Sequence, residues 1–178
     1  MANDRFELWS QGKAAAVSLM ALMLLGAGCA TAPPPGPPLN TAGLFPSNGL
    51  LTHRGILTIR GRQYALNGYL ALSEKRGMRL ILSETFGGVL ADLLVRPNGD
   101  AVVLRSSPMF RPQWIERYVA ADVKCIFGST PSGPCPVRQL DSKHFLIERR
   151  WYKLDLRVVE MKPGPQPDAL FDEHIGSG

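Results

Sequence analysis

The stretch Gln63-Tyr-Ala-Leu-Asn-Gly-Tyr-Leu-Ala-Leu-Ser73 decides the fold predicted for this chain. Apolar side chains recur at every second position on one face of it, whereas Asn67 and Ser73 fall on the other face. The members of the apolar face are Tyr64, Leu66, Leu70 and Leu72. Because successive side chains of a strand point to opposite faces of a sheet, this alternation predicts a β-strand with one buried face.

Similar patterns lie on both sides of this stretch. Residues 56–60 are rich in β-branched side chains and end at Gly61, and residues 78–83 alternate after a polar turn. Residues 89–95 are apolar on both faces apart from Asp92, and the turn at 97–100 leads into a further run at 101–105. Short turns of this kind join antiparallel strands. Residues 51–106 therefore predict an antiparallel meander of five strands.

The hydrophobic period changes after residue 110. Pro112 suits the first turn of a helix, and apolar residues follow it at helical spacing: Trp114, Ile115, Tyr118, Val119, Val123 and Ile126. This spacing predicts an amphipathic helix over about 111–127, and two more strands are predicted at 144–151 and 152–160. The predicted fold class is mainly β: a curved antiparallel sheet, or incomplete β-barrel, with one helix across its concave face.

The segment before this domain, residues 1–28, has the layout of a secretory signal peptide. Its apolar run at 14–28 follows Arg5 and Lys13 and is shorter than the roughly 20 residues of a spanning helix. Leu25-Gly-Ala-Gly-Cys29 is similar to a bacterial lipobox, which predicts cleavage before Cys29 and acylation of that cysteine. An uncleaved membrane anchor, or ordinary cleavage that leaves a free thiol, are the alternatives.

Two further segments flank the predicted domain at 44–162. Residues 29–43 combine the lipidated cysteine with a proline-rich stretch, which favours an extended, semi-rigid tether. Residues 163–178 are rich in proline, glycine and acidic residues and predict a disordered tail. Ala30, rather than aspartate, follows the cysteine, and by resemblance to enterobacterial sorting this favours the outer membrane. We expect a monomer in the cell envelope, lipid-anchored to the outer membrane and facing the periplasm.

The chain has a formal net charge of +5. A basic balance is typical of proteins that bind nucleic acid or an anionic membrane surface. Because an exported protein rarely meets nucleic acid, we expect no nucleic-acid partner. The basic residues are instead predicted to face anionic lipid or lipopolysaccharide, and a solvated face without a partner is the alternative. These residues are Arg54, Arg60, Arg62, Lys75, Arg76 and Arg79.

Besides the lipidated Cys29, two cysteines, Cys125 and Cys135, remain after the predicted cleavage. The segment between them contains glycines and prolines, which favour turns. An oxidising compartment permits a disulfide bridge. Closing so short a loop would stabilise the fold by roughly 3 kcal/mol in the chain-entropy description. The three histidines lie far from any cysteine pair with zinc spacing, so neither a metal site nor a cofactor is predicted.

The strand and helix order resembles that of the LolA/LolB-like superfamily, and in particular its lipoprotein members. The resemblance covers roughly residues 51–160 and rests on Arg60-Gly-Arg-Gln-Tyr64, Met78-Arg-Leu-Ile-Leu-Ser-Glu-Thr-Phe-Gly-Gly88 and Val95-Arg-Pro-Asn-Gly99. It implies an incomplete barrel with an apolar cavity that carries acyl chains. It also implies that Phe86 takes the position of an exposed apolar loop residue in LolB, the alternative being that Phe86 folds into the core.

The residues themselves suggest the walls of such a cavity. The apolar face of the sheet is predicted to lie opposite two aromatic residues of the helix. The alternative is that these two residues are simple core residues. The predicted cavity residues are Tyr64, Leu66, Leu70, Leu72, Leu80, Leu82, Leu93, Trp114 and Tyr118. Apolar pockets are common binding sites, so one hypothesis is a module that binds an acyl chain, a lipid or a lipoprotein. The other is an envelope interaction protein whose core is filled.

No catalytic signature stands out in the sequence. It contains no nucleophile elbow, phosphate loop or HExxH motif. Ser106, Ser107, Asp92 and His144 could be drawn into a triad, but their spacing does not demand one. Asp92 is instead predicted to pair with an arginine or to face solvent. We therefore expect a protein that is not an enzyme and has no catalytic residues.

Overall fold

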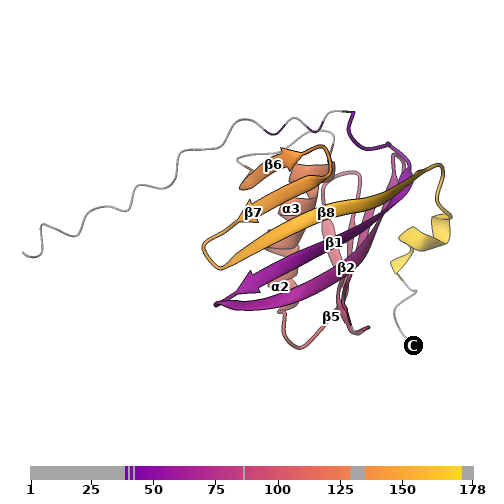
Figure 1. Cartoon of the computed structure of the whole chain (residues 1–178). Coiled ribbons are helices and arrows are strands. Elements are labelled where there is room, and N and C mark those ends of the chain that lie inside the picture. The colour runs from indigo at the N-terminus through magenta and orange to yellow at the C-terminus, as the bar shows by residue number, and fades with distance from the viewer. Residues whose placement is uncertain (1–38, 40, 42, 86, 129–134, 174–178) are drawn as a thin grey trace, which may run out of the picture. The chain divides into compact units, whose positions relative to one another are not determined.

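The computed structural model of the protein describes residues 39, 41, 43–85, 87–128 and 135–173. Eight strands in these residues form a single antiparallel sheet (Figure 1). They are β1 (Gly49–Ile59), β2 (Arg62–Ser73), β3 (Gly77–Glu84), β4 (Val89–Val95), β5 (Ala101–Ser106), β6 (Val137–Asp141), β7 (His144–Glu148) and β8 (Tyr152–Pro163). The order is β5-β4-β3-β2-β1-β8-β7-β6, and the described edge strands β5 and β6 do not pair with each other. The predicted mainly β fold is confirmed, with a sheet that stays open.

The alternation that predicted a strand at Gln63–Ser73 is confirmed in β2. Leu66, Leu70 and Leu72 are buried on the concave side, while Tyr69 points outward and is exposed. On the neighbouring strand β1, Leu51 lies opposite Leu70. These central strands bury their apolar face beneath the helix, and this burial drives the sheet and the helix together.

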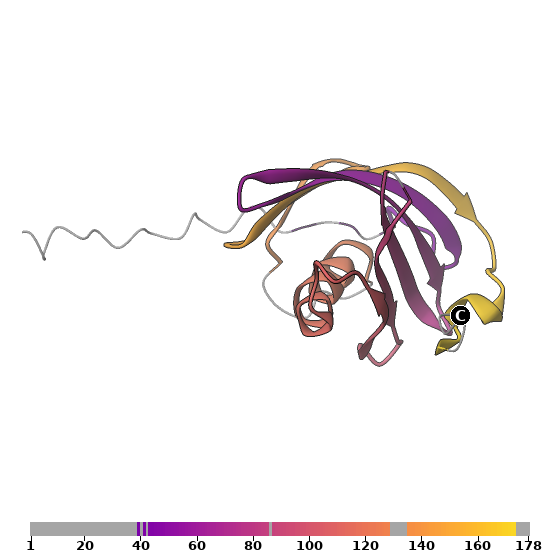
Figure 2. The same ribbon diagram turned by 90° about the horizontal axis from the view of Figure 1, so that it is seen from below.

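One helical run crosses the concave side of the sheet, and Figure 2 shows the sheet curving around it. It consists of α2 (Pro112–Trp114), a π-helical turn η1 (Ile115–Val119) and α3 (Ala120–Phe127). The helix predicted over about 111–127 is confirmed, with Pro112 in its first turn. The π turn, which the apolar spacing did not predict, lies where the helix faces the sheet.

Two elements differ from the sequence prediction. β1 begins at Gly49, ahead of the run predicted at 56–60, and β6 was not predicted at all. β6 is a short edge strand in which only Val137 is buried, so it carries little apolar signal. It forms because Val137 pairs opposite Ile147 of β7.

The C-terminal segment also differs from the disordered tail predicted at 163–178. β8 extends to Pro163, and a 3₁₀ turn, η2 (Asp168–Phe171), packs on the outer face of the sheet. Phe171 is buried there against Ala71 and Leu94. The exposed pair Arg76–Asp172, with Nη2 and Oδ1 2.6 Å apart, holds the same segment. Apolar burial and ion pairing therefore order residues 163–173, and residues 174–178 lie outside the described residues.

This docking explains why β4 is apolar on both faces. The concave face of β4 meets the helix side of the core through Leu93, while Leu94 on the outer face meets Phe171. Two residues before Leu94, Asp92 accepts hydrogen bonds from Arg79 at 2.9 and 2.6 Å, which confirms the predicted pairing with an arginine. Arg79 Nη1 also donates to the carbonyl oxygen of Leu170 at 2.7 Å, so the buried ion pair fixes the C-terminal segment as well.

Candidate functional site

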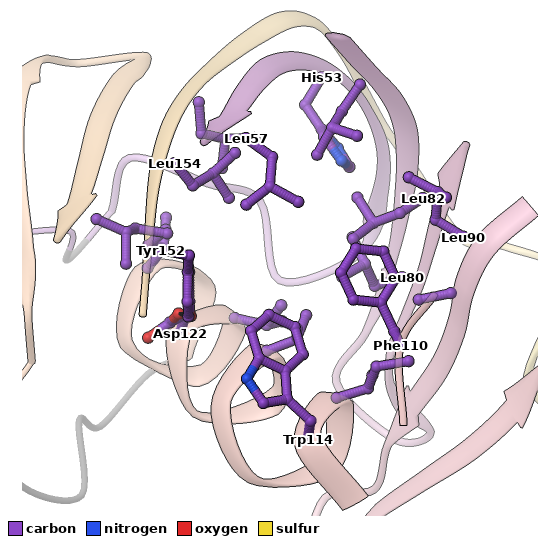
Figure 3. A pocket seen from close by; sticks show the side chains of 18 of the residues that line it. His53, Leu57, Leu80, Leu82, Leu90, Phe110, Trp114, Asp122, Tyr152 and Leu154 are labelled. Carbon is purple, nitrogen blue, oxygen red and sulfur yellow. Dashed lines mark hydrogen bonds between the residues drawn. The ribbon is translucent and has the colours of Figure 1, made fainter. Parts of the chain in front are cut away.

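An apolar cavity of about 60 Å³ lies between the sheet and the helix. Figure 3 shows the open space, with His53 and Trp114 on opposite sides of it. The sheet and the loop before the helix contribute His53, Leu57, Leu66, Leu80, Leu82, Leu90, Ala91, Phe110, Ile147, Tyr152, Leu154 and Leu156. The helix contributes Trp114, Ile115, Val119, Asp122, Val123, Ile126 and Phe127. The walls are almost wholly hydrocarbon, so the space suits an apolar group.

The nine residues predicted to line a cavity fall into three groups. Leu66, Leu80, Leu82 and Trp114 line this cavity. Leu70, Leu72 and Leu93 are buried in the surrounding core and do not line it, and Leu72 instead borders a separate groove of about 570 Å³ beside Phe127 and Gly128. Tyr64 and Tyr118 lie outside the cavity, in an open groove at one end of it. Alternation fixes which face a residue occupies but not whether its neighbours fill the space in front of it.

Three of the seven helix residues that line the cavity come from the π turn and the residue before it. Ile115 and Val119 bound the π-helical stretch, and Trp114 precedes it. A π turn widens the helix locally and is frequently found at functional sites. It lets consecutive turns of this helix present Trp114, Ile115 and Val119 to the same space.

His53 is the polar exception in the wall contributed by the sheet. It is 1 % exposed, and neither of its ring nitrogens has a hydrogen-bond partner among the described residues. Gly68, its partner on β2, makes room for the ring: a Cβ added at Gly68 would lie 2.2 Å from His53 Nε2. Burial lowers the pKa of His53 from 6.5 to about 4, so the imidazole is neutral at pH 7.

Asp122 of α3 ties the helix to the sheet at the edge of the cavity. It accepts hydrogen bonds from Arg149 Nη2 at 2.6 Å and Nε at 3.0 Å, and from the Tyr152 hydroxyl. Burial raises the pKa of Asp122, and the hydrogen bonds from Arg149 and Tyr152 oppose that rise. Burial and the neighbouring Asp122 carboxylate raise the pKa of Tyr152. This cluster fixes the position of the helix, since its polar atoms are bonded to one another.

A larger, open groove of about 950 Å³ lies at the N-terminal end of the helix, and we call it the mouth groove. Its lining residues are Ile59, Arg60, Arg62, Tyr64, Met109, Phe110, Arg111, Trp114, Tyr118 and Trp151. Phe110 and Trp114 line both the mouth groove and the cavity, and their rings stack with centroids 5.4 Å apart. These two rings therefore form the partition between the cavity and the groove.

Tyr118 packs against Trp114, with ring centroids 5.8 Å apart, and also has two arginines over its ring. The guanidinium carbons of Arg117 and Arg149 lie 5.5 and 5.4 Å from its ring centroid. Arg150 lies in the same way over Trp151, at 4.8 Å. Arginines thus lie over two of the aromatic rings that line the mouth groove.

The six basic residues predicted to share one anionic partner do not form one patch. Arg60 and Arg62 lie at the β1–β2 turn, whereas Lys75 and Arg76 lie at the β2–β3 turn, the opposite end of β2. Arg79 is buried with Asp92, and Arg54 lies mid-strand on β1. Only the β1–β2 pair borders the mouth groove.

Several predicted functional residues lie away from the cavity or outside the described residues. Cys29 and Phe86 lie outside them. The Sγ atoms of Cys125 and Cys135 lie 2.14 Å apart and the Cα atoms 5.8 Å apart, the arrangement of the predicted bridge. Of the residues considered for a triad, Asp92 is bound by Arg79, and His144 Nε2 lies 2.8 Å from Asp155 Oδ1.

Sequence reasoning missed most of the residues that line the cavity, His53 and Phe110 among them. His53 stands between Leu51 and Leu57 in strand alternation, so a strand beginning at Gly49 would have placed it on the inner face. Phe110 lies in the loop before the helix, where no periodicity exists. Its position depends on where the helix docks.

Comparison with known proteins leaves the family open. No protein-family model matches the chain, and no curated protein matches it. The resemblance to the LolA/LolB-like superfamily therefore stays a prediction from the sequence. In the described part of the chain, no cluster of three potential metal ligands occurs, and no helix has the length and apolar character needed to cross a membrane.

Proposed function

We propose that this protein is a membrane-anchored envelope lipoprotein that binds the acyl chain of a lipid between its sheet and its helix. Cys29 would carry the anchor, and the protein would receive lipid or lipoprotein at the outer membrane without catalysing a reaction. The observation that carries the proposal is the apolar cavity closed by Phe110 and Trp114 beneath an open groove. An amphiphile has the matching form, with an apolar chain and a polar head.

Two features of the cavity support binding rather than plain packing. The unpartnered His53 costs the folded state the desolvation of a polar group, about 1–3 kcal/mol, which an apolar residue would avoid. The π turn places an irregular part of the helix against the cavity instead of a regular, closely packed face. Both features weaken the core at the same place.

The size of the cavity sets a condition on the proposal. Its volume of about 60 Å³ is below the roughly 150 Å³ that admits benzene in an engineered cavity and the roughly 300–1,000 Å³ of ordinary ligand pockets. An acyl chain can therefore enter only if Phe110 and Trp114 swing toward the mouth groove. This movement would join the cavity to the mouth groove. The same small volume favours the second candidate, an envelope interaction protein with a nearly filled core.

Ligand binding separates the two candidates. Native mass spectrometry of the protein produced with its own signal should find co-purified lipid. The uncharged probe N-phenyl-1-naphthylamine should bind saturably. Ala91→Val, which adds two carbons to the cavity wall, should weaken the probe by at least threefold. Ala65→Val makes the same change on the exposed outer side of β2 and should leave binding unchanged. Absence of both lipid and saturable probe binding would favour the filled-core protein.

A further inference from the structure

We propose that the mouth groove docks on the anionic headgroups of a membrane surface through Arg60, Arg62 and Arg111. The inference extends the proposed function, because the docked groove would open the path from the membrane to the cavity. Its evidence is the charge, the backbone conformation and the exposure of residues that line the mouth groove. It also has its own test, which does not require a ligand in the cavity.

The charge of the mouth groove has one sign. Arg60 and Arg62 from the β1–β2 turn and Arg111 from the loop before the helix line it together, and no acidic residue lines it. All three arginines are exposed, and none forms an ion pair in the described part of the chain. Arg76, at the opposite end of β2, is neutralised by Asp172, whereas exposed arginines such as Arg54 and Arg105 also lack an ion pair, so what sets the three apart is that they share one groove. The unneutralised charge of the mouth groove is complementary to phosphate groups.

The backbone of the β1–β2 turn supports a role for Arg60 that is not structural. Arg60 and Gly61 have φ values of 50° and 78°. Among the residues that the structure describes, Arg60 is the one non-glycine residue with a positive φ. Two-residue turns with positive φ at both positions prefer Asn-Gly, because asparagine tolerates this conformation better than most residues. An arginine here costs stability, and observed strain of this kind concentrates at functional sites. The turn thus has a cation at the tip of the hairpin, where asparagine would be the more stable residue.

Exposed apolar side chains stand beside these cations. Met109 is 50 % exposed and Trp151 is 57 % exposed, and both line the mouth groove. Trp151 is accompanied by Arg150 over its ring. Tryptophan beside arginine is the composition of surfaces that lie in the headgroup region, where the ring is partly desolvated and the cation meets phosphate. This composition favours a lipid surface over a soluble anion.

An N-terminal anchor is compatible with this orientation. The described chain enters the domain near the C-terminal end of the helix, where Phe45 packs against Phe127 with ring centroids 4.8 Å apart. The helix of residues 112–127 is about 24 Å long. Leu44 follows Cys29 by fifteen residues, and a chain of that length can span up to about 50 Å. The mouth groove can therefore reach the membrane that holds the anchor.

Hydrogen exchange of the full chain in vesicles tests the proposal. With phosphatidylglycerol in the vesicles, the segments 59–64, 107–111 and 149–152 should exchange more slowly than in pure phosphatidylcholine. Arg60→Asn, Arg62→Gln and Arg111→Gln together should remove this protection, with roughly fivefold weaker docking for each arginine lost. The charge-matched variant Lys75→Gln, Arg138→Gln, Lys143→Gln alters exposed cations outside the mouth groove and should keep the protection.

Two further measurements distinguish failure of the docking proposal from failure of the proposed function. Arg60→Asn alone should raise the thermal unfolding midpoint while lowering the protection, a combination that a purely structural arginine would not produce. N-phenyl-1-naphthylamine binding reports on the cavity, so the proposed function and the docking surface can fail separately. Equal protection in the two vesicle types, or protection kept by the triple arginine variant, would overturn the proposal. Equal protection by millimolar inorganic phosphate would instead assign the mouth groove to a soluble anion.

Discussion

The two ends of the helix differ in how their aromatic side chains pack and in the charge around them. At the C-terminal end, Phe127 packs with Phe45 and Phe145 at ring-centroid distances of 4.8 and 6.4 Å, and Cys125 lies against Cys135. At the N-terminal end, Trp114 faces the open mouth groove. A groove of about 570 Å³ also borders Lys124, Phe127 and Gly128 at the C-terminal end. We call this end the closed end because its aromatic rings pack together, and we call the end bordered by the arginines of the mouth groove the open end.

This difference separates stability from access. Burial at the closed end supplies apolar contacts that hold the helix in the curve of the sheet. The open end has a strained turn and exposed Trp151 and Met109. Regions that must admit a ligand come from the less stable parts of a fold. Burial at the closed end can therefore hold the helix in place while apolar side chains at the open end stay exposed.

The largest expected effect is a direct test of this division. Phe145→Ala, at a residue with no exposed surface, should lower the free energy of unfolding by about 4 kcal/mol because it removes a large core side chain. Trp151→Ala at the open end should change it by less than about 0.5 kcal/mol. Urea unfolding followed by circular dichroism gives both values. Similar losses from the two variants would break the comparison between the ends.

The cavity between the two ends should make the protein sensitive to acid. The pKa of folded His53 lies near 4, below its ordinary value of 6.5, so the unfolded chain takes up the proton first as the pH falls. The contribution of neutral His53 to stability is therefore complete above pH 6.5 and is lost between about 6.5 and 4. The shift corresponds to about 3 kcal/mol.

Unfolding free energies measured from pH 7 to pH 4 in the wild type and in His53→Leu isolate this effect. The leucine variant should lose less stability over the range, and at pH 7 it should be at least as stable as the wild type because no polar group is buried unpaired. Parallel pH profiles of the two proteins would show that His53 gains a partner that the described contacts lack.

At the closed end, the Cys125–Cys135 pair should contribute about 3 kcal/mol if the bridge forms. Cys125→Ser with Cys135→Ser should lower the unfolding free energy by that amount under non-reducing conditions, and a reducing agent should have the same effect on the wild type alone. Titration of denatured, unreduced protein should find neither of these thiols. Two reactive thiols from this pair would exclude the bridge.

The smallest expected effect lies at the open end and has the opposite sign. Arg60→Asn should raise the free energy of unfolding by about 1 kcal/mol, because asparagine relieves the strain of a positive φ. Gly61→Ala in the same turn, at φ 78°, should lower it by a similar amount. Thermal unfolding of the three proteins compares them. A destabilising Arg60→Asn would mean that the arginine supports the fold.

Local patterns predicted the elements that bury one face, and they failed where burial depends on distant partners. The alternation in β2 and the helical spacing from Trp114 to Ile126 are properties of neighbouring residues, so both elements were predictable. β6 has one buried residue and depends on its pairing with β7. The segment around Phe171 orders only because Ala71 and Leu94 leave an apolar surface on the outer face.

The candidate site was predictable to the same degree. Leu66, Leu80, Leu82 and Trp114 could be placed on the inner faces that bound the cavity. Leu70 and Leu93 have the same pattern, yet they are core residues without a void in front of them. The difference arises from where the helix crosses the sheet and from which side chains meet there. Neither follows from the period of one strand.

By itself, the sequence determined the antiparallel strands, the single helix and the apolar face between them, because these depend on side-chain periodicity and short turns. Only the tertiary structure decided that a small cavity remains beneath Phe110 and Trp114, and that Arg60, Arg62 and Arg111 surround one groove. These features require residues far apart in the chain to meet. Their positions follow from the curvature of the sheet and the docking of the helix, which are properties of the whole packed domain.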